Sequence, residues 1–120
     1  MTHAVAAARR LAALALILAL PALAASSGPA AAATPAKTVT VAIKMFAFTA
    51  RVITVAPGTT VVWTNEDEDP HTVTATDRSF HSAALDTGGK FSFTFTKAGD
   101  FGYFCSLHPH MTGRVIVKAN

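Results

Sequence analysis

Residues 90–96 read KFSFTFT, a strict alternation of three phenylalanines with small polar residues. Successive side chains of a β-strand point to opposite faces, so this alternation predicts a strand with one buried face and one face toward water. Residues 38–43, TVTVAI, repeat the pattern with Val39, Val41 and Ile43. Phenylalanine, valine and threonine all favour strands. Both segments are therefore predicted to be half-buried strands.

Turn-forming residues mark out further strands between and beyond these two. Pro57-Gly58 separates residues 51–55 from 60–64, Gly88-Gly89 precedes residues 90–96, and Ala98-Gly99-Asp100 precedes residues 101–105. The chain holds about seven such candidates at spacings of roughly 8–12 residues, which is typical of an antiparallel sandwich or barrel. No helical periodicity follows residue 37. We predict an all-β domain of two sheets packed face to face.

The first 24 residues have the layout of a secretory signal peptide. Arg9-Arg10 precede an apolar run at residues 11–20, and Pro21 and the small-x-small sequence Ala22-Leu23-Ala24 follow it. A membrane-spanning helix needs about 20 apolar residues, so we expect export without stable membrane insertion of the mature domain. An uncleaved anchor is the alternative, and the arginine pair alone is only a weak indication of twin-arginine export.

Composition limits what the rest of the chain does. Residues 25–37 are rich in Ala, Pro and Ser and lack bulky apolar side chains, so they are predicted to be a linker before a domain at residues 38–120. Without residues 1–24, eight Lys and Arg stand against seven Asp and Glu, a net charge of +1. This near-balance of charge leaves no basic patch that would bind nucleic acid. A single cysteine excludes an internal disulfide and any multi-cysteine metal site.

The most informative stretch lies between two predicted strands and reads FCSLHPHM, residues 104–111. Cys105, His108 and Met111 place a thiolate, an imidazole and a thioether on one short loop, with two residues between successive ligand types. Soft sulfur ligands beside imidazole select copper over hard cations. The loop therefore indicates a copper site.

One more strong ligand is expected from a neighbouring strand, and His71 is the candidate. It follows Pro70, which fixes the backbone, at the end of an acidic run, residues 66–69. Two histidine nitrogens and one cysteine sulfur with a weak axial methionine describe a blue-copper electron-transfer centre.

Each residue taken singly has a simpler explanation. Cys105 alone would be a small buried apolar residue or would pair with another chain, and Met111 would fill the core. Packing explains poorly, however, why three metal-binding residue types fall within seven positions. We expect His81 and His110 to stay outside the main site, with His110 toward solvent. A secondary surface ion held by both is a weaker alternative.

These motifs resemble the cupredoxin (plastocyanin/azurin) family, most closely its small bacterial members with a short ligand loop, the amicyanins. The resemblance covers residues 52–65, 70–73, 93–102 and 103–117. It implies a cupredoxin-like Greek-key β-sandwich of seven to eight strands. It also implies one type 1 copper held strongly by His71, Cys105 and His108 and axially by Met111. The chain departs from the family at Thr72, where Asn is common, and at His110, where an aromatic residue is usual.

The leader predicts a protein that is periplasmic or otherwise exported. With one metal site we expect an electron carrier rather than an enzyme, and a carrier that must dissociate quickly is expected to be a monomer. His108, surrounded by Leu107, Pro109 and Met111, would meet a redox protein such as a cytochrome, dehydrogenase or oxidase in a brief contact. The acidic run at residues 66–69 either steers a basic partner or is simply a solvated loop. A copper-binding or delivery protein without redox turnover is the alternative function, and the additional histidines slightly favour it. Related multicopper enzymes need further copper sites and longer chains.

Overall fold

The structure is a computed structural model that describes residues 15, 17–19, 24–29 and 36–120. The predicted leader and linker lie largely outside these residues, so they stay predictions. The residues that the structure describes include no helix long and apolar enough to cross a membrane. Residues 36–120 contain every strand that the structure describes.

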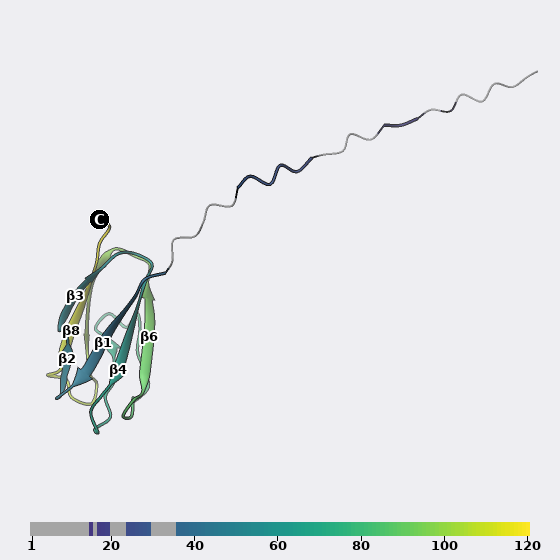
Figure 1. Cartoon of the computed structure of the whole chain (residues 1–120). Coiled ribbons are helices and arrows are strands. Elements are labelled where there is room, and N and C mark those ends of the chain that lie inside the picture. Colours follow the sequence, from purple (N-terminus) through teal and green to yellow (C-terminus); the bar gives the residue numbers. More distant parts are fainter. Residues whose placement is uncertain (1–14, 16, 20–23, 30–35) are drawn as a thin grey trace, which may run out of the picture. The chain divides into compact units, whose positions relative to one another are not determined.

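Eight strands form two four-stranded sheets (Figure 1). The first sheet has the order β2-β1-β4-β6 and the second β3-β8-β7-β5. The strands are β1 (Thr38–Lys44), β2 (Ala47–Thr49), β3 (Val52–Val55), β4 (Thr59–Asn65), β5 (Thr74–Ala75), β6 (Lys90–Phe95), β7 (Gly99–Phe104) and β8 (Thr112–Val117). The predicted all-β sandwich is confirmed.

The expectation of purely antiparallel pairing is wrong, because each sheet contains one parallel pair. Strand β1 runs parallel to β4, and β3 runs parallel to β8. The other four pairings, β1–β2, β4–β6, β5–β7 and β7–β8, are antiparallel. The alternation of residues within a strand cannot distinguish parallel from antiparallel pairing, because paired strands such as β3 and β8 are more than 50 residues apart in the chain. Side chains alternate between the two faces in both arrangements.

The core lies between the sheets and is centred on Trp63 of β4. This side chain is fully buried, and its ring stacks on Phe80 at a centroid distance of 5.9 Å. Tyr103 of β7 meets the same indole edge-on at 5.4 Å. Each buried aromatic side chain of this size contributes a large share of the apolar area removed from water. The cluster therefore joins the two sheets.

Candidate metal centre

His71 reaches the site from the segment that follows β4. Asn65, the last residue of β4, is fully buried, and its side-chain amide donates to the carbonyls of Asp69 and Leu85 at 2.9 and 2.8 Å. Its side-chain oxygen accepts the Asp67 amide at 2.9 Å. These bonds fold the acidic segment back onto β4. His71 then pairs with Leu85, its amide donating at 3.1 Å and its carbonyl accepting at 2.7 Å.

The other predicted ligands, Cys105, His108 and Met111, lie on the loop between β7 and β8. Three backbone hydrogen bonds close this loop. The His108 amide donates to the Cys105 carbonyl at 3.2 Å, and the Met111 amide donates to the His108 carbonyl at 2.9 Å. The Cys105 amide in turn donates to the Met111 carbonyl at 3.0 Å. Two turns therefore fold the loop back on itself, so that residues three apart in sequence lie near one another. Cys105 and Met111 are buried and His108 is half-buried.

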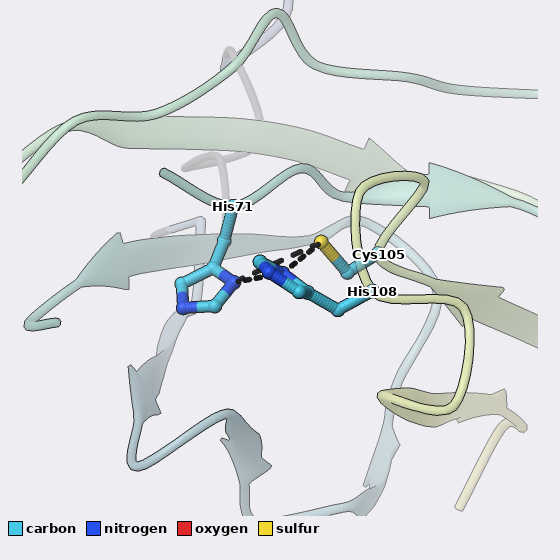
Figure 2. Close-up of side chains that lie close together, drawn as sticks. All are labelled: His71, Cys105 and His108. Atoms are coloured by element: carbon cyan, nitrogen blue, oxygen red, sulfur yellow. Dashed lines mark hydrogen bonds between the residues drawn. The ribbon is translucent and has the colours of Figure 1, made fainter. Parts of the chain in front are cut away.

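Three of the predicted ligands converge (Figure 2). The Cys105 Sγ lies 3.8 Å from His71 Nδ1 and 3.7 Å from His108 Nδ1, and the two nitrogens are 3.2 Å apart. A point equidistant from all three atoms is about 2.1 Å from each, which is the range of metal–nitrogen and metal–sulfur bonds. A nitrogen-nitrogen-thiolate triangle of this size fits a copper ion.

The surroundings of Cys105 favour the deprotonated thiolate form of its side chain. Burial raises its pKa, but the Thr72 amide 3.3 Å away and the imidazoles of His71 and His108 lower it more, and the resulting pKa is about 6. A thiolate is the form that binds metal. The site therefore offers its sulfur deprotonated at neutral pH.

Titration of the metal-free protein tests this shift. We expect the ultraviolet absorption of the thiolate to appear with a midpoint near pH 6, below the ordinary thiol value of 9.0. Because the pKa of the folded state lies below that of the unfolded chain, this group adds stability that is complete above pH 9 and disappears as the pH falls through 6. The Cys105→Ser protein should lack this contribution. A midpoint near 9 would contradict the assignment.

Thr72 joins the two ligand segments, at the position where asparagine is common in the family that the sequence resembles. Its Oγ1 accepts the Ser106 amide at 2.7 Å and lies 2.8 Å from the Ser106 hydroxyl. Its own amide donates to the Cys105 sulfur. Threonine thus ties the segment after β4 to the loop after β7, although its side chain is shorter than the asparagine usual in the family.

His81 and His110 lie outside the triangle, as predicted. His110 is exposed, and its ring centroid is 6.5 Å from that of His108. His81 is exposed and pairs with Thr74 in an isolated bridge. Within the part of the chain that the structure describes, one group of three His, Cys, Asp or Glu side chains has metal-binding spacing, namely His71, Cys105 and His108.

The surface around His108 differs from the prediction. Met111 was expected beside His108 at the surface, but only 2% of it is exposed, because the loop turns its side chain inward. Met45 and Phe46, from the turn between β1 and β2, are exposed instead, at 82% and 42%, and Leu107 at 49%. The Phe46 ring lies 5.1 Å edge-on from that of His108. We call Met45, Phe46, Leu107, His108 and Pro109 the His108 patch.

Not every residue of the acidic run, residues 66–69, is a solvent-exposed charge that could steer a partner. Asp67 is largely covered and lies 2.9 Å from the His71 Nε2. Although burial raises the pKa of Asp67, hydrogen bonds from the Phe46 and Met45 amides and from His71 lower it below the ordinary range. Glu66 forms an exposed ion pair with Lys44 at 3.7 Å. Glu68 and Asp69 are the exposed members of the run without these contacts.

Sequence reasoning missed Asp67, Asn65 and Phe46 at this site. An aspartate among four acidic residues resembles any solvated loop, and nothing distinguishes its position. Asn65 ends a strand, where a polar residue is ordinary. Phe46 and Met45 follow β1 as two apolar residues, without the Asn or Gly that usually indicates a hairpin turn. Their roles depend on contacts with residues distant in the chain, so no local pattern reveals them.

Comparison of this chain with known proteins agrees with the geometry of the site. The sequence pattern of the cupredoxin-like domain family matches residues 11–117, and the chain belongs to that family. Its relatives include amicyanins. It is 34% identical to the amicyanin of Paracoccus versutus over 94 residues, 74% of this chain and 71% of that protein. It is 31% identical to amicyanin-alpha of Methylorubrum extorquens over 89% of this chain and 94% of that one.

A solved structure supports the same conclusion. The Cu(I) form of a methionine-to-alanine mutant of amicyanin superposes with a TM-score of 0.63 and 31% identity, covering 72% of this chain and 85% of that chain. The resemblance to the cupredoxins, and among them to the amicyanins, is confirmed.

Proposed function

We propose that this chain is a type 1 (blue) copper electron-transfer protein, with copper held by His71, Cys105 and His108 and, axially, by Met111. The observation that carries the proposal is the triangle of two imidazole nitrogens and a buried sulfur, drawn from two segments more than 30 residues apart. The similarity to amicyanins, one of them solved as its Cu(I) form, supports copper as the metal. When bound, copper supplies a one-electron couple between Cu(I) and Cu(II).

The protein contributes a rigid ligand frame. His71 is anchored by its backbone pairing with Leu85, Cys105 by that with Met111, and Thr72 joins their segments. Such ligands move little between oxidation states, so little reorganisation opposes electron transfer. Met111, buried on the same loop, is the proposed axial ligand.

The His108 patch is the proposed docking surface. His108 is half-buried, so its ring joins the metal site to the surface. The exposed ring of Phe46 lies edge-on to it, Leu107 precedes it in the chain, and Met45 is exposed on the same turn as Phe46. A small apolar contact suits a redox partner that binds briefly and leaves. Glu68 and Asp69 are exposed on the neighbouring segment and favour a partner with a basic rim, such as a cytochrome.

We also propose export to the periplasm, with residues 1–24 removed as a signal peptide and a monomeric domain at residues 38–120. The arginine pair, apolar run and small-x-small sequence support this proposal. Sequencing the amino terminus of protein from the periplasmic fraction tests it. Ala25 at the terminus is the expected result, and full-length protein in the membrane fraction would instead support a retained anchor.

Voltammetry of the copper-loaded protein tests the function. We expect a fast, reversible one-electron couple with copper retained over repeated cycles. Loss of copper at each reduction would contradict electron transfer and support the alternative of copper delivery. The Ser82→Ala protein, altered at a hydroxyl that accepts the Val73 amide and lies outside the ligand set, provides a control for general loosening of the fold.

Replacement of Met111 by leucine tests the axial assignment. We expect the Met111→Leu protein to keep its intense visible absorption, because the trigonal ligands remain, and to show a higher reduction potential, because the axial ligand tunes it. The swap nearly conserves volume, so unfolding free energy should fall by less than about 1.5 kcal/mol. An unchanged potential in a folded, blue protein would remove Met111 from the coordination sphere.

A further inference from the structure

One carboxylate at the edge of the site meets three hydrogen-bond donors. The Met45 amide donates to Asp67 Oδ1 at 2.7 Å and the Phe46 amide to Oδ2 at 2.9 Å. The same Oδ2 lies 2.9 Å from His71 Nε2. The Asp67 side chain is only 12% exposed, so water competes little for these donors. Asp67 thus contacts both a predicted ligand and the turn between β1 and β2.

That turn has a backbone conformation which side chains disfavour. Lys44 pairs with Ala47, so Met45 and Phe46 form a two-residue hairpin loop. Their φ angles are 52° and 56°, in the left-handed region. Hairpin loops of this kind normally use Asn-Gly, because residues with larger side chains are strained there. The two bonds to Asp67 supply a specific stabilisation for an otherwise unfavourable loop.

The turn matters for the site because it places Phe46 over the imidazoles. The Phe46 ring meets His71 edge-on at a centroid distance of 5.2 Å and His108 at 5.1 Å. Loss of the turn conformation would move this ring and expose the fully buried His71 to water. The turn is therefore a third loop of the site, although it offers no ligand.

The same carboxylate determines which nitrogen of His71 carries a proton. An ionised aspartate only accepts hydrogen bonds, so the Nε2 beside it must be the donor. Nδ1 is then the nitrogen left for a metal, and it lies 3.8 Å from the Cys105 sulfur and 3.2 Å from His108 Nδ1. Carboxylate partners fix the tautomer and ring orientation of metal-binding histidines in general.

We propose that Asp67 is a positioning residue with two simultaneous roles: it holds His71 with Nδ1 available for metal, and it holds the strained Met45-Phe46 turn that covers the imidazoles. The consequence for copper rests on the proposed function. The contacts themselves are properties of the metal-free protein, so they are tested without copper, and their failure would be distinguishable from failure of electron transfer.

Nitrogen-15 NMR of the metal-free protein tests both roles. We expect a slowly exchanging His71 Nε2–H resonance and protected Met45 and Phe46 amides in the native protein. In Asp67→Ala the imidazole resonance should be lost and exchange at both amides should rise at least about tenfold, since each loses its acceptor. Glu68→Gln, at the exposed neighbouring position, is the matched control and should leave these three signals of the free protein unchanged. Native-like signals in Asp67→Ala would overturn the proposal.

A repaired turn separates the two roles. Met45→Asn with Phe46→Gly supplies the sequence that favours left-handed hairpin loops. Added to Asp67→Ala, it should restore the native chemical shifts of Lys44 and Ala47, the pair that flanks the turn, but not the His71 Nε2–H resonance. Restoration of both signals would mean that Asp67 acts on His71 only through the turn, which contradicts direct positioning.

A second variant keeps the proposal testable if Asp67→Ala does not fold. Asp67→Asn retains the shape but only one acceptor oxygen, so at least one of the three donors must lose its partner; native protection at all three would overturn the proposal. In either folded variant, Cu(I) affinity measured by competition with a chelator should fall about 10- to 100-fold. An unchanged affinity would refute positioning of His71 for the metal.

Discussion

Replacing Cys105 by serine should abolish the intense visible absorption of the copper-loaded protein. That absorption arises from charge transfer between a thiolate and copper, and Cys105 is the one cysteine of the chain. An alcohol stays protonated where this thiol, with a pKa of about 6, is ionised. The substitution therefore removes the thiolate ligand but leaves the imidazoles of His71 and His108 in place. Visible absorption after addition of one equivalent of Cu(II) measures the effect.

Ser106→Ala provides the matched control for this substitution. Ser106 is the next residue along the loop and is exposed, and its amide, which donates to Thr72, is unaffected by the change. The control protein should keep the full band. Circular dichroism should show native β-structure in both variants. A full-strength band in folded Cys105→Ser would refute the assigned sulfur ligand.

The largest expected loss of stability comes from adding one carbon atom at Gly113. Gly113 is buried in β8 opposite Tyr103 of β7, and a Cβ built there would lie 2.4 Å from Tyr103 Cζ and 2.5 Å from its hydroxyl oxygen. The Tyr103 ring is 1% exposed and packed between the sheets, so it has little room to move. We expect Gly113→Ala to lower the unfolding free energy by about 3 kcal/mol or more.

Gly102→Ala is the control, because Gly102 pairs with Arg114 in the same two strands. Its added Cβ would meet the Thr76 hydroxyl at 3.5 Å, an ordinary contact. That variant should be neutral or slightly stabilising, since alanine restricts the unfolded chain. Urea unfolding of the metal-free proteins measures both. Equal stability of the two variants would contradict the close packing of Tyr103 beneath β8.

The architecture was largely predictable because it depends on local alternation. The stretch at residues 90–96 became β6, and the alternating valines of residues 38–43 became β1. Turn residues such as Pro57 and Gly58 lie between β3 and β4 as expected. The parallel pairs β1–β4 and β3–β8 were not predictable. Alternation along a strand indicates which face of the sheet each side chain occupies, but it does not indicate which other strand lies beside that strand.

The metal-binding side chains were predictable for a different reason. Cys105, His108 and Met111 lie on one loop, so their spacing alone brings them near one point. His71 required only that its segment end at the same edge of the sandwich. The supporting residues were not predictable in this way. Asp67 and Phe46 act through contacts between the β1–β2 turn and the acidic segment, about 20 residues apart in sequence.

The central claim is that His71, Cys105 and His108 close on one copper ion. The most direct test is to add one equivalent of Cu(II) to the purified protein and record visible and electron paramagnetic resonance spectra together. The account predicts an intense sulfur-to-copper band and a single Cu(II) signal, both lost on reduction and both restored on reoxidation. A weak, pale absorption without sulfur character, from a folded protein whose thiol stays free to titrate, would contradict it.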